Sequence, residues 1–150
     1  MTFEKKENMK NILILIALVI FASCSSEDSK EDQLGKFEGI KLILPQGEWK
    51  VGKFIKDEVD QTANFESFVF TFNKDGNVLA QNDLFSENGT WLYVKETDLK
   101  ENLVLTFGQI EPLDEISDDW QIVSIGASKI ELIDKGSNPK DTKLLSFLKL

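Results

Sequence analysis

Large apolar side chains recur at every second position in several short segments of this 150-residue chain. The clearest case is the series Phe68, Phe70 and Phe72. Alternate residues of a strand point to the same face of a sheet, so this spacing predicts strands with one buried face. Long helical periodicity is missing between residues 47 and 150. That part of the chain is therefore predicted to be all-β.

Eight strands are predicted from this alternation and from the turn-forming residues between the segments. They cover residues 48–56, 65–72, 77–81, 89–95, 102–107, 120–125, 129–134 and 143–150. Gly and Asn adopt the positive φ that tight hairpins need, so turns are predicted at residues 73–77, 87–89 and 126–128. Consecutive hairpins imply an antiparallel meander.

One face of these strands is predicted to form the core. Its members are Phe68, Phe70, Phe72, Trp91, Tyr93, Leu103, Leu105, Phe107, Trp120, Ile122, Ile130, Leu132, Leu144 and Leu148. The opposite positions are mostly polar, which is typical of a sheet with one solvated face. Eight antiparallel strands can close into a barrel or split into a sandwich. The hairpin-linked order favours an up-and-down barrel, because closure removes the exposed edges.

The N-terminal residues 1–23 have the layout of a secretory signal. Three lysines precede an apolar run at residues 12–22, which is too short to span a bilayer. Cys24 follows Phe21-Ala22-Ser23, and this arrangement resembles the lipobox of bacterial lipoproteins, in which small residues precede a modified cysteine. The resemblance implies that Cys24 becomes a lipidated N-terminus. A cleaved signal that leaves Cys24 unmodified is the alternative.

Residues 24–46 are predicted to be the lipidated cysteine and a flexible acidic tether. Residues 25–32 are polar and acidic and have no apolar side chain to bury. They also resemble the export signal that some Gram-negative bacteria place after the lipidated cysteine to send lipoproteins to the cell surface. We therefore expect the lipid on Cys24 to hold the protein at the outer membrane, and the acidic segment is compatible with exposure at the cell surface.

The composition excludes several functional classes. Without residues 1–23 the chain keeps 14 lysines and 24 acidic residues, a net charge of −10, which disfavours binding to nucleic acid. The chain has no histidine, no arginine and, once Cys24 is acylated, no free thiol. Disulfides, Cys/His zinc sites and Ser-His-Asp or Cys-His catalysis are therefore absent. We predict no cofactor, no metal, no catalytic residues and no enzymatic activity.

The order of motifs along residues 44–150 resembles the small lipocalin-like domains of bacterial surface lipoproteins. Gly47-Glu48-Trp49 opens the first strand, and Phe70-Thr71-Phe72-Asn73-Lys74-Asp75-Gly76 follows. Asn88-Gly89-Thr90-Trp91 and a late Leu-rich strand complete the series. The resemblance implies a lipocalin-type barrel in which Trp49 closes the bottom. It implies a fold and a location more than an activity.

The predicted inward face carries many aromatic rings, and it leaves two alternatives open. An eight-stranded barrel has room for packed side chains or for one small ligand. Rings of this size fill space, so a packed interior is preferred. If a cavity for a small apolar or aromatic ligand exists, we expect Phe70, Trp91, Tyr93 and Trp120 to line it, with Tyr93 as the polar contact.

Residues 108–119 form a connection that is longer than a hairpin needs, and such loops are often functional. The loop contains four closely spaced carboxylates, Asp114, Glu115, Asp118 and Asp119. They could converge on Ca²⁺, but their spacing differs from that of an EF-hand, so a solvated loop or a partner-binding lid is preferred. The apolar residues of this loop, Ile110, Leu113 and Ile116, are candidates for an exposed patch.

These features predict a lipid-anchored, non-catalytic binding domain of the cell envelope. It would bind a small apolar ligand or a glycan in or near the barrel mouth, and its signature would be a pocket with exposed aromatic side chains. The alternative is an envelope accessory or protein-interaction lipoprotein. In that case the barrel would be filled and the loops would present an apolar patch to the partner.

Overall fold

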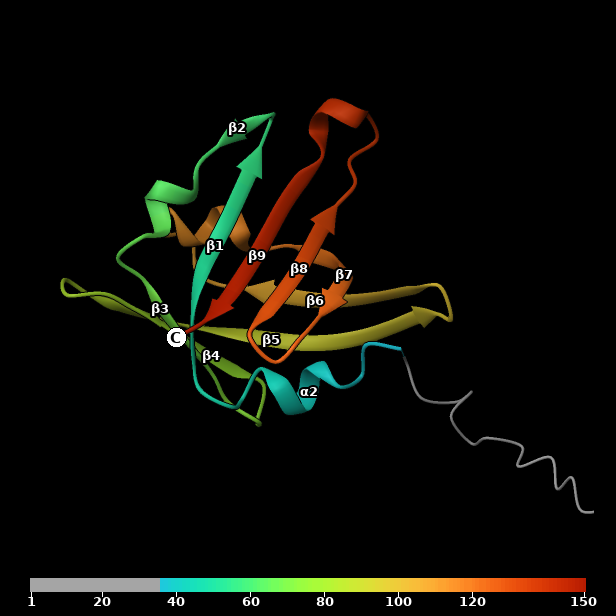
Figure 1. Cartoon of the computed structure of the whole chain (residues 1–150). Helices are drawn as coiled ribbons and strands as arrows, with labels where there is room; N and C mark the ends of the chain where they lie inside the picture. Colours follow the sequence, from blue (N-terminus) through green and yellow to red (C-terminus); the bar gives the residue numbers. More distant parts are fainter. Residues whose placement is uncertain (1–35) are drawn as a thin grey trace, which may run out of the picture. The chain divides into compact units, whose positions relative to one another are not determined.

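The computed structural model describes residues 36–150, and the predictions for residues 1–35, Cys24 included, lie outside these residues. The elements in chain order are α2 (Ile40–Ile43), β1 (Glu48–Lys56), β2 (Val59–Asp60), η2 (Thr62–Phe65), β3 (Val69–Phe72), β4 (Asn77–Gln81), β5 (Ser86–Thr97), β6 (Lys100–Thr106), η3 (Leu113–Ile116), β7 (Asp119–Ile125), β8 (Lys129–Asp134), η4 (Pro139–Asp141) and β9 (Lys143–Lys149) (Figure 1). The fold is therefore almost entirely β, as the alternation predicts.

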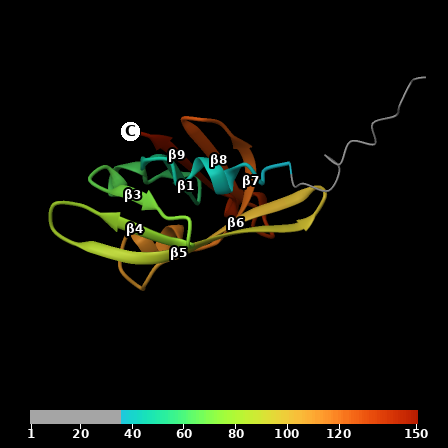
Figure 2. The same cartoon turned by 90° about the horizontal axis from the view of Figure 1, so that it is seen from below.

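Eight strands close into an antiparallel barrel. Each strand from β3 to β9 pairs with the next along the chain, and β1 pairs with both β3 and β9 (Figure 2). The closing pair runs from Trp49 opposite Lys149 to Ile55 opposite Leu144. The ninth strand, β2, pairs only with β1 through a tight turn at Asp57 and Glu58, both of which have positive φ. The predicted eight-stranded up-and-down barrel is confirmed.

Two strand predictions need correction. Residues 65–68 lie outside β3, because Phe65 ends η2 with its ring buried in the core and residues 66–68 form the turn into β3. The turn predicted at residues 87–89 is part of β5, and the chain reverses instead at residues 82–85, where the Asn82 side chain accepts hydrogen bonds from two backbone N–H groups. Gly89 serves close packing, because a Cβ there would lie 2.4 Å from the carbonyl oxygen of Thr106.

The inward face of the last strand also differs from the prediction. Leu145 and Phe147 are buried, whereas Leu144 is exposed and Leu148 is only partly buried. The sequence Leu144-Leu145-Ser146-Phe147-Leu148 places apolar residues on both faces, so alternation cannot choose between them. The structure orients the larger Phe147 inward, where its ring contacts Phe70 and Phe72 at centroid distances of 5.4 and 5.5 Å.

The barrel has two ends that differ in their connections. The α2 end consists of residues 36–47 and the tight hairpins at 73–76, 98–99 and 126–128. The loop end consists of the longer segments 57–68, 82–85, 107–118 and 135–142. Residues 36–46 were predicted to be tether, but Ile40 and Leu44 are fully buried against the barrel. The folded domain therefore begins before residue 47.

Candidate functional site

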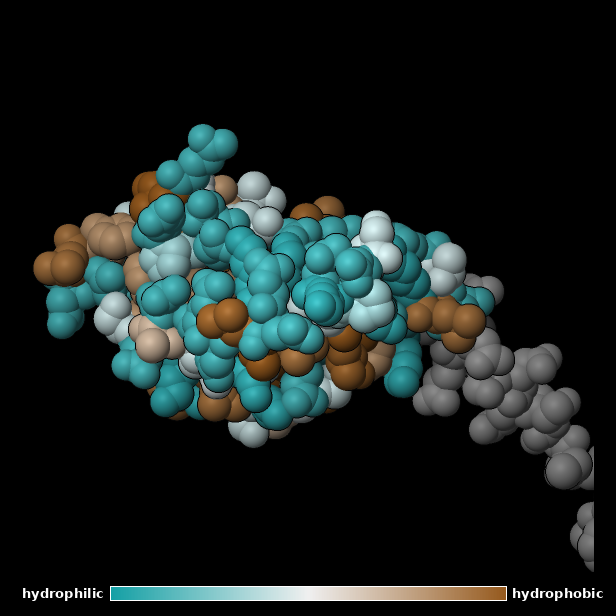
Figure 3. All heavy atoms as spheres, turned by 90° about the horizontal axis from the view of Figure 1, so that it is seen from above, coloured by the Kyte–Doolittle hydropathy of each residue, from teal (hydrophilic) through white to brown (hydrophobic). Residues whose placement is uncertain are grey.

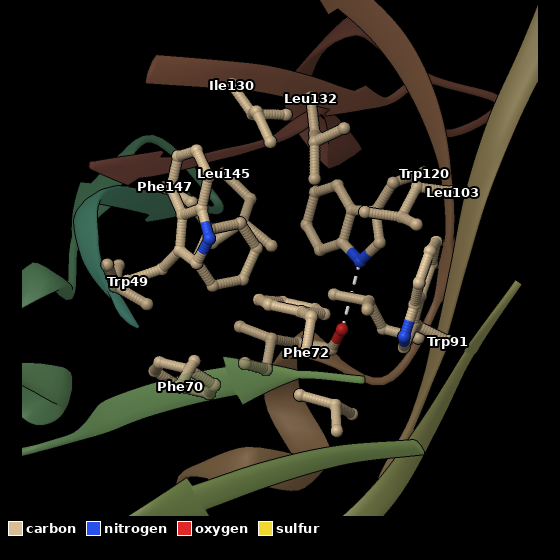
Figure 4. Close-up of a cluster of buried hydrophobic side chains, with 14 of the residues drawn as sticks. Trp49, Phe70, Phe72, Trp91, Leu103, Trp120, Ile130, Leu132, Leu145 and Phe147 are labelled. Carbon is tan, nitrogen blue, oxygen red and sulfur yellow. Dashed lines mark hydrogen bonds between the residues drawn. The ribbon is translucent and has the colours of Figure 1, made fainter. Parts of the chain in front are cut away.

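The barrel interior is occupied by aromatic and branched side chains (Figure 4). Three of the four predicted ligand-lining residues, Phe70, Trp91 and Trp120, are at most 7 % exposed. The Phe70 ring lies edge-on to the rings of Phe107 and Phe147 at 6.1 and 5.4 Å. A ligand at these positions would have to displace packed rings, each of which contributes to the core. The role of these residues in ligand binding stays a prediction.

All three tryptophans donate their indole N–H to a backbone carbonyl of a segment at one end of the barrel. Trp49 bonds Leu44 at the α2 end, and Trp120 bonds Ile116 at the loop end, each at 2.9 Å. Trp91 donates to Asn73 in the β3–β4 hairpin at the same distance. A buried indole needs such a partner, so each bond fixes the segment that supplies the carbonyl. Trp49 thus lies at the α2 end of the barrel, and its role as the closing residue of a lipocalin-type bottom stays a prediction.

The fourth predicted lining residue, Tyr93, bonds a buried carboxylate. Its hydroxyl donates to Glu101 at 2.7 Å, and the N–H groups of Lys36 and Phe37 donate to the two oxygens of the same carboxylate at 2.6 Å. Burial and the hydrogen bond to Glu101 raise the pKa of Tyr93 above its ordinary value. Glu101 thereby fixes the first described residues of the chain to the β5–β6 hairpin.

Sequence reasoning missed Glu101, although one signal was available. Glu101 shares the alternation of Leu103 and Leu105, so it lies on the inward face of β6. An inward carboxylate at the end of a strand needs donors, and these come from Tyr93 on β5 and from backbone N–H groups 64 and 65 residues earlier. Only the folded chain brings those backbone groups to it.

The long acidic loop folds back into the barrel. Leu113 and Ile116, on η3, are fully buried, and only Ile110 of the predicted apolar patch is exposed. The predicted patch is therefore wrong for two of its three residues. The Ser117 hydroxyl donates to the carbonyl of Leu113 and accepts from the N–H of Phe107, which fixes both ends of the turn. The loop covers the barrel mouth with its own apolar side chains.

The carboxylates of this loop face different partners. Glu115 pairs with Lys56 from β1, whereas Asp118 pairs with Lys143 from β9. Within residues 36–150, no three Asp, Glu, His or Cys side chains are arranged to hold a metal ion. The alternative in which the loop carboxylates converge on calcium has no geometric support among these residues.

Lys143 is the centre of an ion cluster at the loop end. Its ammonium contacts Asp118 and lies 3.2 Å from Asp134, with the Trp120 ring at 5.7 Å. Partial burial is the largest single influence and opposes both charges, but the hydrogen bonds and opposite charges of the cluster together outweigh it, so the pKa of Asp118 is lowered and the pKa of Lys143 is raised. The cluster joins the beginnings of β7 and β9 to the end of β8.

Exposed apolar side chains lie at the tips of the two long hairpins. At the β4–β5 turn Leu84 is 90 % exposed, and Phe85 is partly exposed with its ring against Phe68 at 5.6 Å. At the β5–β6 turn Leu99 is 93 % exposed. Figure 3 shows hydrophobic groups at the left and right extremes of a mostly hydrophilic face, where these two hairpins project. No helix among the described residues has the length and apolarity needed to cross a bilayer.

The two ends of the barrel differ more in net charge than in their exposed apolar side chains. The four segments of the loop end carry ten carboxylates and two lysines, a net charge of −8. The segments of the α2 end carry three lysines, Lys36, Lys41 and Lys74, and three carboxylates, Glu38, Asp75 and Asp98, a net charge of zero. Half of the 20 carboxylates among residues 36–150, and all of the net negative charge of these residues, therefore lie at the loop end.

Comparison with known proteins supports the fold. No protein-family model and no curated protein matches the sequence. The structure is similar to the crystal structure of a DUF4847 family protein from Bacteroides vulgatus, with a TM-score of 0.50 and 15 % sequence identity. The likeness covers 73 % of this chain and 96 % of that chain. At this identity the comparison shows a shared β-barrel fold and nothing about activity.

Proposed function

We propose that this protein is a lipid-anchored, non-catalytic interaction domain of the cell envelope, which binds another protein through the loop end of a filled barrel. The observation that carries the proposal is the filled interior. Phe70, Trp91 and Trp120 pack in the core, and Leu113 and Ile116 cover the mouth. The space that would hold a small apolar ligand or a glycan contains side chains of the protein itself.

The β4–β5 turn exposes an apolar side chain that a partner protein can contact, whereas the interior is filled. Asn82 accepts hydrogen bonds from the N–H groups of Leu84 and Phe85 at 2.9 and 3.0 Å, which sets the conformation of the turn. A rigid turn that exposes a leucine loses little conformational entropy on binding. The acidic segments around this end favour a partner with a basic surface, because complementary charge accelerates association.

The lipid anchor is supported by the sequence around Cys24 and by the order of segments. The predicted signal and the acidic residues 25–32 directly precede the folded domain. Two or three acyl chains would hold the domain on a bilayer, since each buried methylene contributes about 0.8 kcal/mol. Location at the outer membrane, and exposure at the cell surface, belong to this proposal.

Photocrosslinking in intact cells tests the interaction. A photoreactive amino acid at Leu84 should give a discrete adduct with one envelope protein. The matched control is the same amino acid at Leu92, which is 60 % exposed on β5. Equal adducts from both positions, or none from Leu84 in a folded and anchored protein, would refute the interaction through the loop end.

A further inference from the structure

We propose that the α2 end is a membrane-docking surface, in which Leu42 and Leu99 enter the bilayer that holds the lipid anchor of the same chain. This inference rests on the proposed lipidation of Cys24. It adds an orientation to that proposal, since the barrel would stand with its loop end directed away from the membrane. The surface consists of α2 and the β5–β6 hairpin, and it contacts lipid.

Leu42 is directed away from the barrel. The short helix α2 buries Ile40, and successive helical residues turn by about 100°, so Leu42 lies about 200° from Ile40 on the helix. Its side chain is 67 % exposed. An exposed leucine on a single helical turn next to a tether is well placed to contact a surface rather than the core.

Leu99 lies beside the point where the tether meets the domain. Glu101, two residues after Leu99, accepts hydrogen bonds from the N–H groups of Lys36 and Phe37 at 2.6 Å. The described chain therefore begins between α2 and the tip of the β5–β6 hairpin, as both ribbon views show (Figures 1 and 2). The two exposed leucines flank the entry point of the chain.

The length of the tether limits how far this end can lie from the membrane. Cys24 and Lys36 are 12 residues apart, which corresponds to at most about 40 Å for an extended chain. Strand β1 alone has nine residues, or about 30 Å. For the loop end to reach the bilayer, the tether would have to run back along nearly the whole barrel.

Charge favours the same orientation. The loop end has a net charge of −8, and a bilayer with anionic lipids repels it. The segments of the α2 end have a net charge of zero, and two ion pairs lie at the docking surface. Lys41 pairs with Glu38 at 2.8 Å, and Lys95 pairs with Asp98 at 2.9 Å, so the approach of this surface to lipid meets no net repulsion.

Single-cysteine labelling tests the proposal on the full-length lipidated protein. Acylation blocks Cys24, the only natural cysteine, so each of the variants Leu42→Cys, Leu99→Cys, Leu84→Cys and Leu92→Cys carries one reactive thiol. The purified proteins are labelled with an environment-sensitive fluorophore and reconstituted into phosphatidylethanolamine and phosphatidylglycerol vesicles. We expect blue-shifted emission, and quenching by spin-labelled lipid, at positions 42 and 99 only. The labels at positions 84 and 92 should keep the emission maximum of a water-exposed label and should not be quenched by spin-labelled lipid.

Two negative results have different meanings. If the protein floats with the vesicles but the labels at 42 and 99 stay in water, the docking surface is refuted while the lipid anchor stands. If the protein fails to float with vesicles, the anchor itself fails and the docking surface fails with it. Blue-shifted emission at Leu84 instead of Leu99 would reverse the orientation and refute the inference as well.

Discussion

The two ends of the barrel are closed in the same way but present different surfaces. At each end a buried tryptophan donates its indole N–H to a backbone carbonyl, from Trp49 to Leu44 and from Trp120 to Ile116. Outside this common closure, the α2 end is uncharged overall, whereas the loop end has a net charge of −8. The comparison indicates that closure of the barrel serves stability, and we propose that the surfaces around the closures differ in function.

The largest effects are expected from removal of the two closing rings. Trp49→Ala and Trp120→Ala should each lower the free energy of unfolding by about 3–5 kcal/mol, because each deletes a fully buried indole and its hydrogen bond. Denaturant unfolding measures both losses. Hydrogen exchange should then accelerate in residues 36–47 for the first variant and in residues 107–118 for the second. Acceleration at both ends in both variants would contradict independent closures.

Glu101→Gln is expected to have the next largest effect, confined to the α2 end. The amide accepts more weakly than the carboxylate and its NH₂ group faces a donor, so the loss should be about 1.5–3 kcal/mol in the free energy of unfolding. Tyr93→Phe is the matched control, since it removes one donor and leaves the carboxylate with the backbone N–H groups of Lys36 and Phe37. It should cost less than Glu101→Gln. Equal losses would show that the backbone contacts contribute little.

Lys143→Met should weaken the loop end in a pH-dependent way. The substitution keeps an apolar stem near Trp120 but leaves Asp118 and Asp134 without their cation, for a loss of about 1–2 kcal/mol at pH 7. Because the pKa of Asp118 is lowered in the folded protein, its contribution should be lost as the pH falls below about 4. Because the pKa of Lys143 is raised, its contribution should be lost as the pH rises above about 10.

Unfolding curves of the wild type and of Lys143→Met between pH 2 and pH 11 check this prediction. The difference between the two proteins should be constant between about pH 5 and pH 9 and should shrink outside that range. A difference that does not change with pH would mean that the loss comes from packing on Trp120 and not from the ion cluster.

The smallest effects on stability are expected at the exposed hairpin tips. Leu84→Ser and Leu99→Ser should each change the free energy of unfolding by no more than about 0.5 kcal/mol, because both side chains are almost fully exposed. The two substitutions should affect different functions. Leu84→Ser should reduce binding to the envelope partner, and Leu99→Ser should reduce contact with lipid. The same loss of both properties in either variant would remove the distinction between the two ends.

Much of the fold follows from the sequence because local signals and the global fold agree there. The predicted bounds of β1, β4 and β8 match the structure, and Gly76 has the positive φ that its turn requires. The Asn and Gly at residues 88 and 89 misled the turn prediction, since Gly89 is needed for close packing on Thr106 and Phe107. Composition alone does not separate a turn glycine from a packing glycine.

The candidate site was harder to predict because it depends on contacts between distant segments. Most aromatic residues of the interior were found, because alternation marks them, but Phe54, Phe65 and Phe147 were missed. The burial of Leu113 and Ile116 was missed, since an acidic loop with three apolar residues looks solvated until the barrel mouth is in place beside it. The hydrogen-bonded carboxylate of Glu101 was missed for the same reason. Its two backbone donors, the N–H groups of Phe37 and Lys36, are 64 and 65 residues away in the chain.

The most direct test of the filled barrel is a ligand titration followed through the tryptophans. The full-length lipidated protein in vesicles is titrated with small glycans and short-chain fatty acids while the fluorescence of Trp49, Trp91 and Trp120 is recorded. We predict no saturable quenching, since all three rings pack in the core. Saturable quenching that is lost in a folded Trp91→Phe or Tyr93→Phe variant would show a ligand in the interior. That result would contradict the filled barrel and restore the small-ligand alternative.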